Sequence, residues 1–161
     1  MPFIKPTYNI DGDVTDIIVE ALINDGVKGL IFDLDSTLME SKSARLTDEV
    51  NVWLSKARPH FKMVILSNNK NAIYLEKVKT ILDIPVIGYA KKPSRRGFRQ
   101  AMDMLELTPQ EVAVVGDRPL TDILGGHRSG AKTVLVKILR TIKEPSWKTS
   151  IRNLERRLIG K

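Results

Sequence analysis

The sequence has 161 residues, of which 42% are hydrophobic and 28% charged, and it carries a formal net charge of +7. This composition is that of one globular domain with its own core, and it excludes a disordered chain. No apolar run is long enough for a transmembrane helix, and residues 1–6 lack the apolar stretch of a signal peptide, so we expect a cytoplasmic protein. The absence of cysteine excludes disulfides, thiolate metal sites and cysteine nucleophiles.

Hydrophobic spacing along the chain predicts an alternation of strands and helices in a single domain over residues 1–161, after an N-terminal arm over residues 1–12. The predicted strands cover residues 27–34, 62–66, 86–89, 112–117 and 133–136. The predicted helices cover residues 14–22, 46–57, 75–82, 98–105 and 119–129, and a basic helix follows over about 146–159. Strands that alternate with helices are typical of a doubly wound, Rossmann-like sheet, so we predict an α/β fold with five parallel strands.

Four of the predicted strands end in ionisable or hydroxyl side chains. In chain order these are Asp33 with Asp35, then Ser67, then Lys92, then Asp117 with Asp122. The carboxyl ends of the strands in an open parallel sheet form the ligand crevice, so we expect these side chains to meet at one edge. Buried carboxylates without cations would cost several kcal/mol, by rough estimates of ion desolvation. A hard divalent cation would bind the carboxylates, and a phosphate group would bind the ammonium and the hydroxyl, so the two together explain this set of side chains.

Each of these residues alone is weak support for a site. Taken alone, Ser67 is an ordinary hydroxyl residue at the end of a strand, Lys92 an ordinary surface lysine, and Asp122 an ordinary acidic residue at the start of a helix. The ordered set is more specific, and it resembles the haloacid-dehalogenase-like (HAD) phosphatase superfamily. The motifs that carry the resemblance are Asp33-Leu34-Asp35-Ser36-Thr37, Ser67, Lys92 and the stretch from Gly116-Asp117 to Thr121-Asp122. The resemblance covers residues from about 25 to 136 and predicts a phosphoryl-transfer site.

The resemblance implies a role for each motif residue. Asp33 would attack phosphorus and become an aspartyl phosphate, while Asp35 would act as the general acid and then the general base. Magnesium would be held by the Asp33 carboxylate, the Asp35 main-chain carbonyl and Asp117, with Asp122 acting through water or orienting Lys92. The phosphate-binding residues would be Ser67, Asn68, Lys92 and Thr37, with Thr37 also bracing the loop after the first predicted strand.

Short spacings between the motifs predict an open site. Only 29 residues lie between Thr37 and Ser67, and 24 between Ser67 and Lys92, so each interval holds one helix and one strand and no cap domain. Within the capless HAD phosphatases, the sequence is similar to the YqeG-type group of subfamily IIIA, which includes phosphatidylglycerophosphate phosphatases. The carrying residues are Ile31 to Leu38, Leu66 to Asn69, Ala90 to Pro93, Gly116 to Gly126 and Leu154 to Leu158.

Two positions depart from the pattern of that group. Ser36 stands where the group commonly has Asn, and Arg118-Pro119 stands where it commonly has Gln-Leu. Neither change removes a catalytic group. Arg118 adds a cation beside the predicted site, and its role is left open.

Most of the excess positive charge lies near the C-terminus. Residues 137–161 hold eight Lys and Arg against two Glu, and the predicted last helix places apolar residues on one stripe between the basic ones. Such a helix either docks on the domain or binds a membrane surface. A second basic cluster, from Lys91 to Arg99, is either a solvated face or a site for an anionic partner.

The resemblance implies a magnesium-dependent phosphomonoesterase that dephosphorylates phosphatidylglycerophosphate, a phospholipid. With the basic C-terminal region, it leads us to expect this activity at an anionic membrane surface on the cytoplasmic side, without a transmembrane segment. The alternative is a HAD phosphatase for a soluble sugar, nucleotide or nucleic-acid-end phosphate, although we do not expect nucleic acid to be a partner. A signalling receiver domain is disfavoured because Asp33 and Asp35 share one strand end and Asp117 comes late in the chain. A binding protein on an inactive phosphatase scaffold is disfavoured because every required residue is present. The sequence does not determine whether the protein forms an oligomer.

Overall fold

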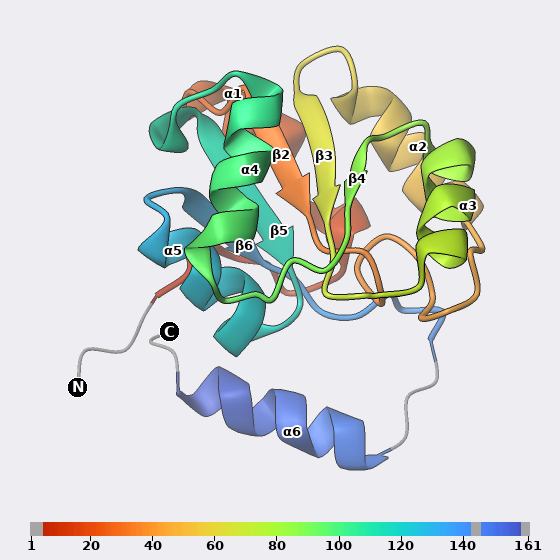
Figure 1. Cartoon of the computed structure of the whole chain (residues 1–161). Coiled ribbons are helices and arrows are strands. Elements are labelled where there is room, and N and C mark those ends of the chain that lie inside the picture. The colour runs from red at the N-terminus through yellow and green to blue at the C-terminus, as the bar shows by residue number, and fades with distance from the viewer. Residues whose placement is uncertain (1–4, 143–145, 159–161) are drawn as a thin grey trace.

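A six-stranded parallel sheet, covered by helices on both faces, forms the centre of the computed structural model, which describes residues 5–142 and 146–158 (Figure 1). The strands are β1 (Tyr8–Asn9), β2 (Gly29–Phe32), β3 (Lys62–Leu66), β4 (Val86–Ile87), β5 (Val112–Gly116) and β6 (Lys132–Leu135). Their order across the sheet is β1-β6-β5-β2-β3-β4. The predicted doubly wound α/β fold is therefore confirmed.

Helices occupy the connections between the strands. The α-helices are α1 (Val19–Asn24), α2 (Asp48–Ala57), α3 (Ala72–Leu82), α4 (Arg95–Leu105), α5 (Leu124–Arg128) and α6 (Ser146–Arg157). Three short helical segments add to them, namely η1 (Val14–Asp16), η2 (Pro109–Glu111) and η3 (Pro119–Ile123). The predicted helix over residues 119–129 thus consists of η3, which is a π-helix, followed directly by α5.

The prediction of five strands was wrong by one, because the N-terminal arm contributes β1. Tyr8 pairs with Val134 in the neighbouring β6. The backbone amides of Thr7 and Thr133 each donate to the hydroxyl of the other residue, which fastens the start of the arm to the sheet. A strand of two residues carries no hydrophobic alternation, so the sequence pattern could not reveal it. Residues 1–4 of the predicted arm lie outside the described residues.

The central strands are apolar on both faces because both faces are covered. Leu30 and Phe32 of β2 belong to one core cluster, with α1, α2 and α3, whereas Ile31 belongs to a second cluster with α4. The ring of Phe32 meets that of Trp53 edge to face, with 6.0 Å between the ring centres. This three-layer arrangement buries β2 completely and holds its carboxyl end in a fixed position.

The helix predicted over residues 14–22 is broken in the middle. Asp13 caps η1, and Ile17 then takes an extended conformation before α1 begins. Arg140, from the segment after β6, donates its Nε to the buried Asp13 carboxylate at 3.0 Å. Ile18 precedes α1 as its extended N-cap residue and is 65% exposed, although its helical spacing predicts burial.

The last helix, α6, lies across the carboxyl edge of the sheet (Figure 1). It begins at Ser146 as predicted and ends at Arg157, while residue 159 of the predicted span lies outside the described residues. Its predicted apolar stripe is not packed against the domain. The stripe consists of Trp147, Ile151, Leu154 and Leu158, which are 61%, 44%, 59% and 41% exposed. Within the described residues, no helix combines the length and the apolar character needed to span a bilayer.

Candidate active site

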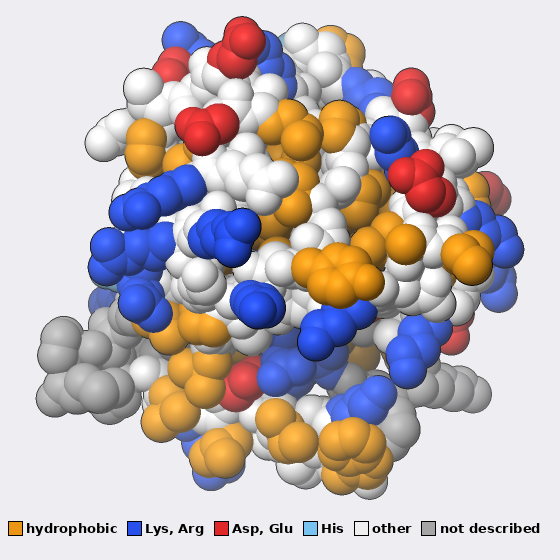
Figure 2. All heavy atoms as spheres, in the orientation of Figure 1, with side chains coloured by type: hydrophobic (Ala, Val, Ile, Leu, Met, Phe, Trp, Pro, Cys, Tyr) orange, Lys and Arg blue, Asp and Glu red, His pale blue; other side chains and the backbone are white. Residues whose placement is uncertain are grey.

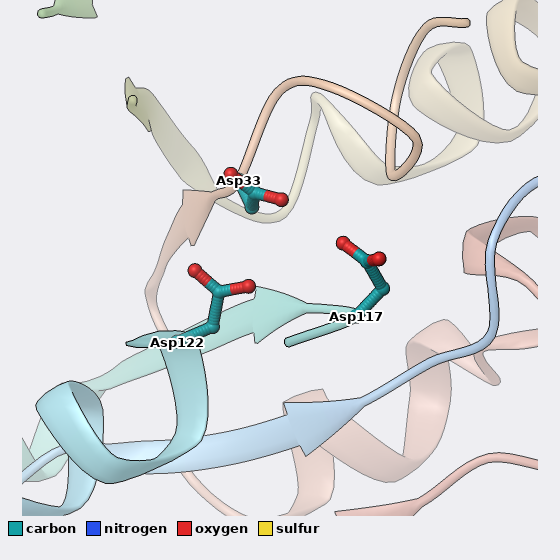
Figure 3. Close-up of side chains that lie close together, drawn as sticks. All are labelled: Asp33, Asp117 and Asp122. Atoms are coloured by element: carbon teal, nitrogen blue, oxygen red, sulfur yellow. The ribbon is translucent and has the colours of Figure 1, made fainter. Parts of the chain in front are cut away.

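Three carboxylates from two strand ends and η3 converge at the carboxyl edge of the sheet. Asp33 follows β2, Asp117 follows β5, and Asp122 lies in η3. One oxygen of each lies within 4.8 Å of the others, and Figure 3 shows the three side chains around a common space. The parallel register of β2 with β5 brings the first two together, because Phe32 pairs with Val115 and each acid follows shortly after. The three residues therefore meet at one edge of the sheet, as expected, and their roles as metal ligands and nucleophile stay predictions.

Lys92 is the ammonium group that the carboxylates require. Its Nζ donates to Asp33 Oδ1 at 2.8 Å and to Asp122 Oδ1 at 2.7 Å, and only 3% of its side chain is exposed. Burial alone would lower the pKa of this lysine, but Asp122 and Asp33 outweigh burial and raise the pKa. Lys92 therefore stays charged, and it is the buried member of a basic cluster whose other members, such as Lys91, are exposed.

Asp117 is fully buried and both of its oxygens accept hydrogen bonds. Thr37 Oγ1 donates to Oδ1 at 3.1 Å, and Arg152 Nε on α6 donates to Oδ2 at 2.7 Å. Burial, with the neighbouring charges of Asp33 and Asp122, raises the pKa of Asp117 to about 8. The Thr37 hydroxyl also lies 3.4 Å from Asp33 Oδ2, so Thr37 contacts the carboxylates that follow β2 and β5.

Asp35 lies apart from this cluster, and a different group holds its carboxylate. Tyr74 of α3 donates its hydroxyl to Asp35 Oδ1 at 3.0 Å, and the Lys42 amide donates to the same oxygen at 3.4 Å. Burial and the charge of Asp35 raise the pKa of Tyr74, so the phenol remains protonated and donating. Tyr74 was not predicted as a site residue, since it follows ordinary helical spacing and carries no motif. Asp35 was predicted as a metal ligand through its main-chain carbonyl, and its carboxylate does not join the other three.

Ser67 and Asn68 follow β3 and line the same cavity as the acids, which has a volume of about 380 Å³. Ser67 is buried, and its hydroxyl accepts the Asn69 amide at 3.0 Å. Asn68 exchanges two hydrogen bonds with the Lys92 backbone, accepting from its amide at 2.7 Å and donating to its carbonyl at 3.4 Å. Asn68 thus holds the backbone of the segment that carries Lys92. The sequence analysis did not predict this role for Asn68.

Helix α6 reaches the site through its polar face. Besides the contact of Arg152 with Asp117, Glu155 accepts both Nε and Nη2 of Arg118 at 2.9 Å each. Arg156 donates to the Val136 carbonyl at 2.7 Å. Arg118, whose role the sequence left open, therefore ties η3 to α6. The basic tail was predicted, but its contact with the carboxylates was not, because nothing in the helix sequence shows which basic residue faces inward.

The donor set of the cluster fits a hard divalent cation. Carboxylate oxygens are the ligands that Mg²⁺ and Ca²⁺ prefer, and Asp33, Asp117 and Asp122 each offer one. When ionised, the three carboxylates carry three negative charges against the two positive charges of Lys92 and Arg152, so the cluster would attract a further cation. A phosphate group beside that cation would meet Lys92 and Ser67 on the same wall of the cavity.

Comparisons with known proteins agree with this geometry. Residues 89–140 match the family model described as HAD-hydrolase-like. The chain is 38% identical to the probable phosphatase YqeG of Bacillus subtilis, over 77% of this chain and 72% of that protein. It is 28% identical to phosphatidylglycerophosphate phosphatase 1 of Arabidopsis thaliana, over 98% of this chain but only 47% of that protein.

A structural comparison supports the fold. The putative HAD-hydrolase YfnB of Bacillus subtilis superposes with a TM-score of 0.54 at 13% identity, and the match covers 68% of this chain and 86% of that one. At this identity the likeness concerns the fold alone. The 38% identity with YqeG, over 77% of this chain and 72% of that protein, shows that the two belong to one family. The chain therefore belongs to the HAD-like phosphatases of the YqeG type, which are hydrolases of phosphoric monoesters.

Proposed function

We propose that this phosphatase is a magnesium-dependent enzyme that forms an aspartyl phosphate on Asp33 and removes the terminal phosphate of phosphatidylglycerophosphate. The observation that carries the chemistry is the cluster of Asp33, Asp117 and Asp122 around Lys92 at the wall of an open cavity. A nucleophile, a phosphate-binding cation and a metal-ligand set lie within one site.

In the first half-reaction, a carboxylate oxygen of Asp33 forms a bond to phosphorus while the phosphorus–oxygen bond to the leaving alcohol breaks. Asp35 gives its proton to the leaving oxygen, which departs as the alcohol. In the second half-reaction, Asp35 takes a proton from water, the water oxygen bonds to phosphorus, and Asp33 is released with inorganic phosphate. Tyr74 holds the Asp35 carboxylate in place through both steps. Lys92 and Ser67 bind the transferring phosphoryl oxygens.

Asp33, Asp117 and Asp122 would hold the magnesium ion, with the Asp35 main-chain carbonyl as a further ligand. When bound, the cation reduces the repulsion between the anionic nucleophile and the anionic phosphate ester. YfnB, a relative in fold, was crystallised bound to magnesium. The proposal for this chain rests on its own carboxylates, whose number and hardness suit the ion.

The lipid substrate is supported by the likeness to phosphatidylglycerophosphate phosphatase 1 and by the surface of α6. Hydrophobic side chains gather along the lower edge of the molecule in Figure 2, over α6, with basic side chains beside them. The four residues of the exposed stripe would enter the interface of an anionic bilayer. Each nearby Lys or Arg would add about 1 kcal/mol of attraction to such a surface.

The test is phosphate release from phosphatidylglycerophosphate in mixed micelles, beside soluble sugar and nucleotide phosphates at equal concentration, with Mg²⁺ and with EDTA. We expect a strong preference for the lipid and loss of turnover in EDTA. A preference for a soluble ester would contradict the lipid assignment and leave the Asp33 chemistry standing. Sedimentation with phosphatidylglycerol vesicles at low salt tests the membrane part, and no binding there would contradict it.

A further inference from the structure

One wall of the active-site cavity belongs to α6 and has no counterpart in the motifs. Trp147, Lys148, Ile151 and Arg152 line the cavity opposite the strand-end residues Asp33, Ser67 and Lys92. No cap domain lies in the two described intervals between the motifs, since residues 38–66 and 68–91 hold only one helix and one strand each. Among the described residues, α6 is therefore the element that covers the site from outside the sheet.

The chemistry of the α6 wall is mixed. Lys148 and Arg152 bring two positive charges, and Trp147 and Ile151 bring apolar surface. Lys148 Nζ lies 5.4 Å from the centre of the Trp147 ring. Arg152 reaches the carboxylate cluster, because its Nε donates to Asp117 at 2.7 Å.

A single phosphate monoester does not require Lys148, and the Nε of Arg152 already donates to Asp117. The transferring phosphoryl group already has Lys92 and Ser67 on the sheet side, together with the proposed metal ion. Additional cations on the opposite wall suit a second anionic group, a few bonds from the first. The exposed apolar side chains beside them suit a hydrophobic part of the same ligand.

We propose that Lys148 and Arg152 bind a second phosphate of the substrate, so that α6 selects phosphomonoesters that also carry a phosphodiester, while Trp147 contacts the acyl-bearing part. This inference rests on the proposed function and deepens it, because it assigns substrate selection to α6. In this proposal α6 selects the substrate, which is the role of the cap domain in HAD enzymes that have one. Arg152 and Lys148 are specificity-determining residues, and neither takes part in bond making or breaking.

The experiment compares kcat/KM for three substrates that differ in one feature each. Dihexanoyl phosphatidylglycerophosphate has both phosphates and acyl chains, its deacylated head group has both phosphates alone, and glycerol 3-phosphate has one phosphate. The variants are Lys148→Gln, Arg152→Gln and Trp147→Ala. Arg157→Gln is the matched control, because Arg157 is an exposed basic residue of the same helix that does not line the cavity.

We expect the wild type to prefer the head group to glycerol 3-phosphate, and Lys148→Gln and Arg152→Gln to lower this preference about tenfold each, as for a lost charged hydrogen bond. Because the readout is a ratio of two substrates, an effect of Arg152 on the metal site cancels. Arg152→Lys should restore part of the preference. Trp147→Ala should lower only the preference for the acylated lipid over the head group, and Arg157→Gln should change neither ratio.

An unchanged preference in both Lys148→Gln and Arg152→Gln, with a wild type that favours the head group, would overturn the inference and leave the proposed function standing. A wild type that hydrolyses glycerol 3-phosphate as efficiently as the head group and the lipid would overturn both, since no second phosphate would then be recognised. Equal losses in Arg157→Gln would also overturn the inference, because they would indicate a general charge effect.

Discussion

The two walls of the active-site cavity are built in different ways. The inner wall consists of side chains at and near strand ends. Its charged groups Lys92, Asp117 and Asp122 are buried, and Lys92 is paired with Asp122. The outer wall is α6, which is held by Arg152, Glu155 and Arg156 through polar contacts and leaves its apolar residues largely exposed. Phosphoryl transfer needs fixed geometry, and the inner wall supplies it. A helix held by a few polar contacts can differ between enzymes without disturbing that geometry.

The sharpest way to test the role of the inner wall is Asp33→Asn, which keeps the shape of the side chain and removes the nucleophile. We expect phosphatase activity to fall by about 10⁴-fold or more, as when a nucleophile is lost in other enzymes. Circular dichroism should show an unchanged fold. Substantial remaining activity would contradict the assignment of Asp33 and, with it, the division between the two walls.

A pair of adjacent lysines tests how strongly the inner wall depends on its internal cation. Lys92→Met leaves Asp33 and Asp122 without their partner, so we expect a loss of about 3–5 kcal/mol in the free energy of unfolding, measured in urea with EDTA. Lys91→Met changes an exposed neighbour and should cost less than about 0.5 kcal/mol. Similar losses in the two variants would argue against a buried charge network.

The inner wall should also make the metal-free protein sensitive to pH. Folding raises the pKa of Asp117 from 3.8 to about 8, so in this window the folded state keeps a proton that the unfolded state has lost. Stability therefore decreases as pH rises from about 4 to about 8.

Urea unfolding in EDTA at several pH values measures this dependence, and Asp117→Asn is the control that removes the titrating group. We expect a flatter pH profile in the variant. A profile of the same slope in both proteins would show that Asp117 is not the group responsible.

The smallest expected effect concerns the outer wall. Arg118→Gln breaks the bidentate pair with Glu155, which is partly exposed on the arginine side, so we expect α6 to lose only about 1 kcal/mol of docking free energy. Hydrogen exchange of the α6 amides should become about fivefold faster, while exchange in β2 and β5 stays unchanged. Arg157→Gln is the control on the same helix. Faster exchange throughout the sheet would show that the two walls are not independent.

Much of the inner wall was predictable from the sequence. The buried strands β2, β3 and β5 read as apolar runs, and parallel strands must bring the residues that follow them to one edge. The order of strands and helices along the chain is therefore enough to group Asp33, Lys92 and Asp117. By contrast, β1 is too short to carry a pattern, and its position depends on pairing with β6.

The remaining site residues approach from helices and could not be predicted in the same way. Tyr74 and Arg152 occupy ordinary helical positions, and only the packing of α3 and α6 brings them to Asp35 and Asp117. Helical periodicity predicted an apolar stripe in α6, but it could not show that the polar face would be the one docked on the domain.

The most direct test of the mechanism is to look for the phosphoryl group on the protein. Rapid acid quench after mixing the enzyme with Mg²⁺ and phosphatidylglycerophosphate labelled with ³²P on its terminal phosphate should trap labelled protein in the wild type. Asp33→Asn should trap none. Steady phosphate release without labelled protein, or label retained in Asp33→Asn, would contradict the mechanism.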